Sequence, residues 1–236
     1  MNAPGKVYLI PTVLQDDALQ TLPAYLLDAI KNCSVFFVEN EKTTRRFFKK
    51  LWKEMVIDDY QWFVIHKAEA AVKQQFVEVL EKGYTVGILS EAGCPGIADP
   101  GQLLVEAAQV KGFKVMPLVG PNSILLALMA SGMNGQCFQF NGYLPIDSME
   151  RRKKIKALEA NSASNDCTQI FIETPYRNNQ LLGDILQSCN PDTFVCIGKD
   201  ITGPNETIVT KKAAEWRKQL PELHKIPVIF LLKASI

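Results

Sequence analysis

The chain has 236 residues, of which 47% are hydrophobic and 22% charged, and its formal net charge is +1 at pH 7. At roughly 150 residues per domain, this length corresponds to one large domain or two small ones. The apolar content is sufficient for a buried core and excludes a disordered chain. The balanced charge provides no overall field that would attract nucleic acid or a membrane, so any basic surface must be local.

The sequence offers few metal ligands. Among the six cysteines no two have the C-x-x-C spacing, and the two histidines, His66 and His224, have no evident partner, so we interpret both as structural or surface residues. We therefore expect no metal site, reduced thiols and a cytoplasmic protein. The longest apolar run, residues 124–130, is too short to span a bilayer, and the first residues lack the features of a leader, so we expect no membrane contact.

The first half of the chain alternates between short apolar runs and segments with helical spacing, which is typical of a series of βα units. The predicted strands are residues 7–10, 35–38, 85–89 and 114–118, and the predicted helices cover about 22–30, 72–80 and 103–108. Connections of this kind predict a mainly parallel sheet. We assign residues 1–117 to this N-terminal α/β domain.

The second half, residues 118–236, is predicted to be another α/β domain, with a mixed sheet. Its candidate strands are residues 138–140, 168–173, 193–197 and 228–232. One predicted helix ends near Ser131, and two others cover residues 147–160 and 178–187. Asp147 and Glu150 have the spacing of an acidic capping box at the start of one helix. No low-complexity linker separates the halves, so we expect them to pack closely.

A long loop between a strand and a helix is the first candidate for a binding site. Residues 90–101 read Ser-Glu-Ala-Gly-Cys-Pro-Gly-Ile-Ala-Asp-Pro-Gly, directly after a predicted strand. Ligands of open α/β sheets bind beyond the carboxyl ends of strands. The alternative is an ordinary connection whose glycines serve tight turns, but twelve residues is long for one. Asp99 is predicted to be the N-cap of the next helix, with Pro100 in its first position.

Several common catalytic motifs are missing. The sequence contains no G-x-x-x-x-G-K-[ST], no G-x-G-x-x-G after a strand, no G-x-S-x-G and no H-E-x-x-H. These absences argue against a P-loop nucleotidase, an ordinary Rossmann dehydrogenase, a serine hydrolase and a zincin. The residue patterns alone predict an α/β protein that binds a small molecule in a cleft between its two halves.

Six blocks of sequence, in order, resemble the tetrapyrrole (corrin/porphyrin) methylase superfamily. The blocks are Gly5-Lys-Val-Tyr-Leu-Ile-Pro-Thr12, Leu89-Ser-Glu-Ala-Gly-Cys-Pro-Gly-Ile-Ala-Asp-Pro-Gly101, Pro117-Leu-Val-Gly-Pro-Asn-Ser-Ile124, Ser131-Gly132, Phe140-Asn-Gly-Tyr-Leu-Pro145 and Glu173-Thr-Pro-Tyr-Arg177. The nearest branch is that of the ribosomal small-subunit RNA cytidine 2′-O-methyltransferases. The resemblance implies two α/β domains with S-adenosylmethionine in the cleft between them, and a homodimer.

The resemblance also implies which residues contact the cofactor. They are Pro11, Thr12, Glu91, Ala92, Gly93, Cys94, Asn122, Ser123, Ile124, Glu173, Thr174, Pro227 and Val228. The family transfers a methyl group from a sulfonium to a nucleophile, so a ribose hydroxyl would need a base. Glu39 and Lys199 are the candidate catalytic residues. The alternatives are that Glu39 caps the following helix and that Lys199 is a solvated surface lysine.

Two departures from the ribosomal branch bear on the substrate. The branch has Glu-Asp-Thr-Arg where this chain has Glu39-Asn40-Glu41-Lys42, and Arg-Glu-Leu-Thr-Lys where this chain has Lys199-Asp-Ile-Thr-Gly203. In the long loop, Glu91 and Cys94 replace Asp and Thr. The chain therefore resembles a shortened, divergent member of the branch.

An RNA substrate requires local positive charge and surfaces that hold bases. One basic cluster comprises Lys42, Arg45, Arg46, Lys49 and Lys50, and a second comprises Arg151, Arg152, Lys153, Lys154 and Lys156. Such runs also occur as solvated helix faces. The candidate substrate contacts are Tyr143, Arg151, Arg152, Tyr176 and Arg177, of which the aromatic residues could instead serve packing.

The first hypothesis is a cytoplasmic S-adenosylmethionine-dependent methyltransferase that acts on a ribose oxygen of ribosomal RNA. One alternative is methylation of a corrinoid or porphyrin precursor. Another is a module that binds S-adenosylmethionine with reduced catalysis, which the altered Glu39-Asn40-Glu41-Lys42 segment suggests.

Overall fold

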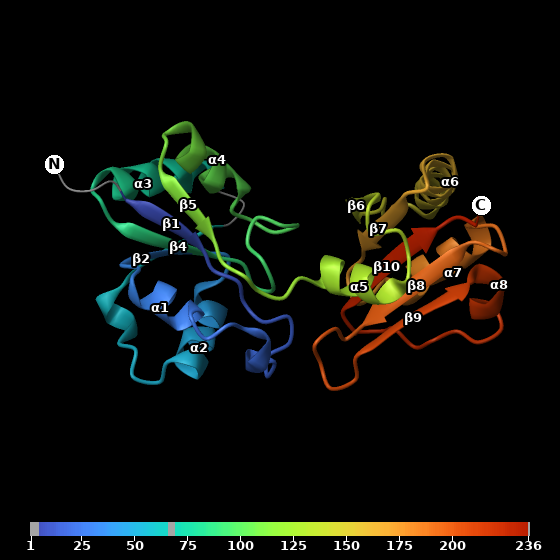
Figure 1. Cartoon of the computed structure of the whole chain (residues 1–236), viewed down its shortest axis with the longest axis horizontal. Helices are drawn as coiled ribbons and strands as arrows, with labels where there is room; N and C mark the ends of the chain where they lie inside the picture. Colours follow the sequence, from blue (N-terminus) through green and yellow to red (C-terminus); the bar gives the residue numbers. More distant parts are fainter. Residues whose placement is uncertain (1–4, 66–68, 236) are drawn as a thin grey trace. The chain divides into compact units, whose positions relative to one another are not determined.

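The computed structural model describes residues 5–65 and 69–235, and the chain divides into two compact units, unit 1 (Met1–Asn122) and unit 2 (Ser123–Ile236) (Figure 1). His66 lies outside the described residues. The six cysteines are all free thiols. None of the helices described is long and apolar enough to cross a membrane.

Unit 1 contains a five-stranded sheet in the order β3-β2-β4-β1-β5. Its strands are β1 (Lys6–Leu9), β2 (Val35–Val38), β3 (Gln61–Val64), β4 (Thr85–Leu89) and β5 (Lys114–Pro117). Every neighbouring pair is parallel, as the alternating pattern predicts. The sequence prediction did not include β3, an edge strand that is only partly buried, although residues 62–65 form a short apolar run.

Two pairs of helices cover the two faces of this sheet (Figure 1). One face packs on α1 (Leu26–Lys31) and α2 (Glu41–Leu51), and the other on α3 (Glu69–Glu81) and α4 (Gln102–Val110). Short 3-10 helices form at Leu19–Thr21 and Ile57–Asp59. The helix predicted from residue 22 begins only at Leu26, because Leu22 precedes Pro23 and is extended.

Unit 2 contains a second five-stranded sheet, in the order β6-β7-β10-β8-β9. Its strands are β6 (Phe138–Tyr143), β7 (Thr168–Ile172), β8 (Phe194–Lys199), β9 (Thr207–Lys212) and β10 (Val228–Lys233). The pair β6 and β7 is parallel and the other pairs are antiparallel, so the predicted mixed sheet is confirmed. The sequence prediction missed β9, whose residues are half-buried or exposed.

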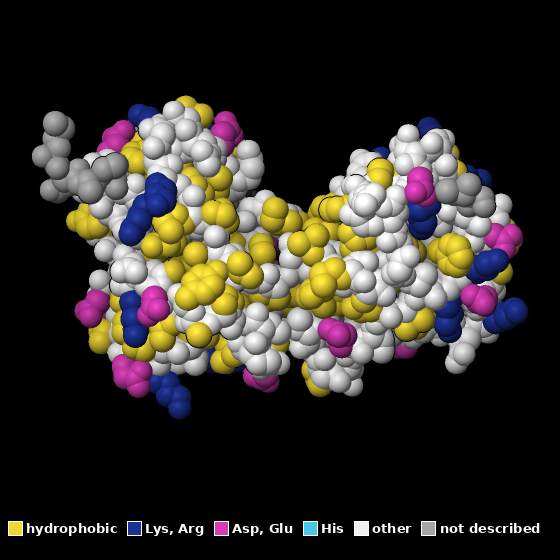
Figure 2. Space-filling view, in the orientation of Figure 1, with side chains coloured by type: hydrophobic (Ala, Val, Ile, Leu, Met, Phe, Trp, Pro, Cys, Tyr) yellow, Lys and Arg dark blue, Asp and Glu magenta, His cyan; other side chains and the backbone are white. Residues whose placement is uncertain are grey.

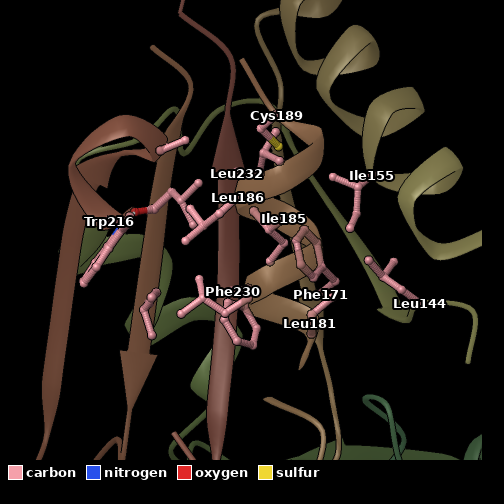
Figure 3. Packing of buried hydrophobic residues seen from close by; sticks show 14 of the residues in the cluster. Leu144, Ile155, Phe171, Leu181, Ile185, Leu186, Cys189, Trp216, Phe230 and Leu232 are labelled. Carbon is pink, nitrogen blue, oxygen red and sulfur yellow. The ribbon is translucent and has the colours of Figure 1, made fainter. Parts of the chain in front are cut away.

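The core of unit 2 lies between one face of its sheet and three helices, α6 (Ser148–Asn165), α7 (Asn178–Ser188) and α8 (Ala213–Trp216). Figure 3 shows Ile155 of α6, Ile185 of α7 and Trp216 of α8 gathered around Phe171 and Phe230 of the sheet. Helix α5 (Ser123–Ser131) packs on the other face, where a Cβ at Gly198 would lie 3.5 Å from that of Ala127.

The start of α6 confirms Asp147 as the N-cap, which is one half of the predicted capping box. The side chain of Asp147 accepts hydrogen bonds from the backbone amides of Met149 and Glu150, both at 3.0 Å. These bonds satisfy two donors that a helix start leaves unpaired. The helix continues past the predicted end at residue 160, to Asn165, where Asp166 adopts a left-handed conformation with φ of 50°.

Candidate functional site

The carboxyl ends of β2, β4 and β1 lie side by side, because these three strands are parallel neighbours at the centre of the unit 1 sheet. The segments that follow them carry Glu39, the long loop from Ser90, and Pro11 with Thr12. This edge is where open α/β sheets bind ligands. The fold thus brings together three segments that the sequence prediction singled out separately.

Thr12 joins the first of these segments to the long loop. Its backbone amide donates to the carbonyl of Gly93 at 2.9 Å, and its hydroxyl donates to the carbonyl of Ser90 at 3.4 Å. The side chain is only 3% exposed. Thr12 is therefore a structural support of the loop.

Glu39 holds the long loop from the other side. Its carboxylate accepts a hydrogen bond of 2.8 Å from the backbone amide of Glu91. The next helix, α2, is instead capped by Asn40, whose side chain accepts from the amides of Lys42 and Thr43. The alternative interpretation of Glu39 as a helix cap is therefore wrong.

Within the loop, Gly93 is a position whose backbone conformation favours a glycine. Its φ is +71°, in the left-handed region, and an added Cβ would meet the Pro121 carbonyl oxygen at 3.3 Å. The neighbouring Glu91 and Ala92 are exposed. The loop therefore exposes backbone beside a carboxylate.

Asp99 differs from its prediction as a helix cap. Helix α4 begins at Gln102, and the residue before it is Gly101, whose φ is 122°. Ala98 also has a positive φ, so the chain turns again before the helix starts and Pro100 falls outside it. Burial, and then the charges of Glu39 and Glu91, raise the pKa of Asp99 from 3.8 to about 6.

A second loop of unit 1 packs against the first. The thiol of Cys94 donates to the carbonyl of Pro121 at 3.6 Å, and burial raises its pKa although a hydrogen bond with Asn122 opposes this. At Gly120 an added Cβ would lie 2.1 Å from the Cβ of Pro11, so no larger residue fits there. The backbone of residues 120–122 therefore closes one side of the long loop.

The remaining residues predicted to contact the cofactor belong to unit 2. Ser123 and Ile124 open α5, and Val228 opens β10 directly after Pro227. Glu173 is 5% exposed and accepts from the amide of Thr174 at 2.6 Å and from Arg177 at 2.7 Å. The Glu173 carboxylate therefore already accepts hydrogen bonds from two residues of the turn that follows it.

The two candidate catalytic residues lie in different units. Glu39 follows β2 of unit 1, and Lys199 ends β8 of unit 2, where it pairs in the sheet with Val228 and Thr207. Lys199 is half-buried.

The structure corrects the role of Arg151. Its side chain is 1% exposed, its Nε donates to Asp184 at 2.7 Å, and its Nη1 donates to the carbonyl of Ile146 at 2.6 Å. A guanidinium buried and satisfied in this way is not available to a phosphate, so Arg151 is a structural residue. Arg152 is exposed, but it also donates to Asp184, at 2.6 Å.

The predicted aromatic contacts are on the surface. Tyr143 is 59% exposed and Tyr176 is 69% exposed. The ring of Tyr176 contacts that of His224 edge-on, with centroids 5.9 Å apart, and the Lys225 ammonium lies 6.0 Å from its centroid. Both rings are accessible to a base, and that of Tyr176 also packs on the ring of His224.

A pocket of about 100 Å³ lies at the same sheet edge of unit 1. It is lined by Thr12, Val13, Asp16, Thr43, Thr44, Arg46, Phe47, Lys50, Ser90 and Glu91. The prediction included the cations of α2 but did not connect them with the long loop. The cations follow β2 at spacings of three and four residues, which places them on one face of a helix. This spacing was the signal in the sequence that could have located them at the sheet edge. Within the described part of the chain, no group of three or more histidine, cysteine or carboxylate residues could hold a metal ion.

A sequence model of the family of Tetrapyrrole (Corrin/Porphyrin) Methylases matches residues 6–216. The chain belongs to this family. Among curated relatives, the Ribosomal RNA small subunit methyltransferase I of Vibrio cholerae is 31% identical over 217 residues, which cover 91% of this chain and 71% of the relative. That of Escherichia coli O157:H7 is 28% identical, over 88% of this chain and 69% of the relative.

Solved structures of similar fold are methyltransferases too. The methyltransferase CobJ has a TM-score of 0.66 at 16% identity, covering 98% of this chain and 95% of CobJ. Uroporphyrin-III C-methyltransferase of Thermus thermophilus, complexed with S-adenosyl homocysteine, has a TM-score of 0.56 at 15% identity, with 97% of each chain covered. The predicted tetrapyrrole methylase fold is therefore confirmed, and so is the prediction of an S-adenosylmethionine-dependent methyltransferase.

The residues of unit 1 fit the cofactor of a tetrapyrrole methylase. S-adenosylmethionine carries a sulfonium, an ammonium and ribose hydroxyls, all of which favour carboxylate neighbours. The loop presents Glu91 on its surface, and Glu39 and Asp99 are close enough for their charges to interact. The absence of a side chain at Gly93 and Gly120 lets the two loops pack closely together, so the segment that carries Glu91 is firmly supported.

Proposed function

We propose that this tetrapyrrole methylase transfers a methyl group from S-adenosylmethionine to a ribose 2′-oxygen of small-subunit ribosomal RNA, in the cytoplasm and as a homodimer. The observation that carries the proposal is the similarity over most of the chain to relatives named Ribosomal RNA small subunit methyltransferase I. The two domains are proposed to be residues 1–117 and 118–236, and the observed unit boundary at Asn122 lies close to that division.

The proposed cofactor contacts in unit 1 are Pro11, Thr12, the loop 91–94 and Asn122. Support comes from the hydrogen bond of Thr12 to Gly93 and from that of Glu39 to Glu91, which fix the loop in one conformation. A preorganised loop binds more tightly because little conformational entropy is lost on binding. In unit 2 the proposed contacts are Ser123, Ile124, Glu173, Thr174, Pro227 and Val228, and there Glu173 acts by shaping its turn.

S-adenosylmethionine supplies an activated methyl group. The acceptor oxygen forms a bond to the methyl carbon as the carbon–sulfur bond breaks, the hydroxyl proton passes to a base, and S-adenosylhomocysteine leaves. The protein mainly orients the two reactants. Because the Glu39 carboxylate is held by a backbone amide, we propose Glu39 as a positioning residue and the Lys199 side chain, in its neutral amine form, as the base that takes the hydroxyl proton.

The proposed contacts with RNA use local charge, since the whole chain is nearly neutral. On the face that Figure 2 shows, charged side chains of both signs are scattered over each unit. On α6 the exposed cations Arg152, Lys153, Lys154 and Lys156 form one basic stretch. With Tyr143 and with Tyr176 and Arg177, they provide charge and stacking surfaces of the kind that single-stranded RNA binds.

The test combines binding and transfer on one sample. Calorimetric titration with S-adenosylhomocysteine is expected to show binding, and incubation with small ribosomal subunits that lack the modification is expected to label the RNA. Binding without transfer to RNA would contradict the RNA proposal. Transfer to a corrinoid or porphyrin precursor would then support the family's other substrate class, whereas no transfer to either would support a cofactor-binding module.

A further inference from the structure

The pocket of unit 1 is built from three segments that are distant in sequence. Thr12 follows β1, Ser90 and Glu91 follow β4, and Thr43, Arg46 and Lys50 belong to α2, which follows β2. Its volume of about 100 Å³ is well below the roughly 300–1,000 Å³ of pockets that enclose a whole small ligand. It therefore suits one group of a larger molecule that passes across the sheet edge.

Arg46 is the cation of this pocket that is ready to bind. On α2 the guanidinium of Arg45 pairs with Glu41 at 2.5 Å and lies over the ring of Trp62 at 5.2 Å. Lys50 donates to the carbonyl of Asp16 at 2.9 Å and pairs with the exposed carboxylate of Asp17 at 3.4 Å. Arg46 is exposed, and within the described part of the chain its guanidinium has no hydrogen-bond or ion-pair partner.

The two walls of the pocket differ in charge. Arg46 and Lys50 lie four residues apart on α2, whereas Asp16 and Glu91 put carboxylates in the lining, and Glu91 accepts from the hydroxyl of Thr43 at 3.4 Å. An anionic group is attracted only to the cationic wall. The carboxylate wall instead favours a neutral hydroxyl that can donate to it. A sugar joined to a phosphate presents both groups side by side.

The cationic wall also continues beyond the pocket. A shallow groove lined by Arg45, Arg46, Lys49, Lys50 and Lys53 shares Arg46 and Lys50 with it. Lys49 donates to the carbonyls of Lys53 and Met55, which orient its charge without neutralising it. A row of cations along a groove is the feature that follows a nucleic acid backbone.

We propose that this pocket binds a phosphodiester group of the RNA strand through Arg46, with the adjoining ribose hydroxyl facing Glu91. The proposal rests on the proposed function and adds a specific phosphate contact to it. The guanidinium suits this role because its planar donors match two phosphate oxygens. The neighbouring phosphates of the strand lie along Lys49 and Lys53.

The test compares three variants of α2. Arg46→Gln removes the charge and the donor geometry, and Arg46→Lys keeps only the charge. Lys42→Gln is the matched control, because Lys42 is exposed on the same helix and does not line the pocket or the groove. Affinity for a small-subunit RNA fragment is measured against salt concentration, and S-adenosylhomocysteine binding is measured by calorimetry.

Arg46→Gln is expected to weaken RNA binding roughly tenfold and to lower the steepness of its salt dependence by about 0.7 in log–log slope, since one phosphate contact is lost. Arg46→Lys is expected to keep the slope and lose part of the affinity. All three variants should bind S-adenosylhomocysteine as the wild type does. If Arg46→Gln behaves like Lys42→Gln, the pocket proposal fails and the RNA proposal stands. If the wild type itself binds no RNA, both fail.

Discussion

The carboxylate of Glu39 and the backbone amide of Glu91 lie 2.8 Å apart and join two segments separated by 52 residues. This hydrogen bond connects the end of β2 to the start of the long loop, and the Thr12 amide holds the same loop at Gly93 from the β1 side. The geometry of the loop therefore depends on a side chain and a backbone amide that lie outside it.

The Glu39 contact predicts a loss of cofactor affinity on substitution. Glu39→Ala removes the acceptor and is expected to cost about 1 kcal/mol of binding free energy, or roughly a fivefold weaker Kd for S-adenosylhomocysteine. Glu39→Gln keeps an oxygen acceptor and should lose less. The exposed Glu54 provides the control, since Glu54→Gln removes a charge far from the loop in sequence. Equal affinities for Glu39→Ala and wild type would show that the loop does not need this contact.

The raised pKa of Asp99 predicts that replacing this residue stabilises the protein in a pH-dependent way. Its pKa is raised from 3.8 to about 6, so the folded chain holds the proton more tightly than the unfolded chain does. Stability is therefore lost as the pH rises from about 4 through 6, and the ionised carboxylate destabilises the fold at pH 7. Asp99→Asn removes this carboxylate and is expected to stabilise the protein at pH 7. The gain is limited to about 1 kcal/mol, because solvent screens the half-buried group.

Urea denaturation at two pH values checks this prediction. The stabilising effect of Asp99→Asn should be present at pH 7 and absent near pH 3, which lies below the ordinary pKa of 3.8, so that Asp99 is mostly protonated in both states. An equal effect at both pH values would mean that the substitution acts through packing and that the pKa is not raised.

Arg151 predicts a large loss of stability. Burial by itself would raise the pKa of Asp184, but hydrogen bonds from Arg152 and Arg151 lower it, so Asp184 stays charged. Arg151→Met leaves this buried carboxylate with fewer partners and is expected to cost about 3 kcal/mol of unfolding free energy.

The double variant Arg151→Met with Asp184→Leu is expected to recover part of that loss, because no buried charge remains unpaired. Chemical denaturation of the wild type, both single variants and the double variant gives the coupling energy. Additive effects of the two substitutions would rule out the ion pair as their cause.

Gly120 predicts a steric effect on the second loop. A Cβ at this position would lie 2.1 Å from the Cβ and 2.4 Å from the Cγ of Pro11, a rigid ring that cannot move aside. Gly120→Ala is expected to destabilise the protein by about 1–3 kcal/mol and to weaken S-adenosylhomocysteine binding. In α7 the exposed Gly183 meets nothing within 4 Å, so Gly183→Ala should stabilise by about 0.5–1 kcal/mol. Thermal melts of the two variants should therefore shift in opposite directions.

The exposed cations of α6 predict a further effect on RNA binding. Lys153→Glu with Lys154→Glu reverses two exposed charges and is expected to weaken RNA binding and flatten its salt dependence. Arg151 is left unchanged, because its substitution would break the buried ion pair with Asp184 and destabilise the protein. A salt dependence equal to that of the wild type would remove α6 from the RNA surface.

Local patterns determined most of the fold. The apolar run at 85–89, the alternation of strands and helices in the first half and the cap at Asp147 depend on neighbouring residues, and the structure has all three. The predictions failed where local signals are weak or ambiguous. The edge strand β3 is short and only partly buried. Asp99 is of a residue type that often caps helices, but Gly101, with a positive φ, turns the chain again before the helix begins.

The sequence by itself determined the α/β class, the two-part organisation and the loops at strand ends, because periodicity, glycine and proline content and capping act over a few residues. Only the tertiary structure decided which side chains are available. Asp184, 33 residues from Arg151, turns that arginine from a candidate phosphate ligand into a buried support. Three parallel strands bring Arg46 and Glu91 to one pocket, and a contact between segments so distant in sequence depends on the order of strands in the sheet.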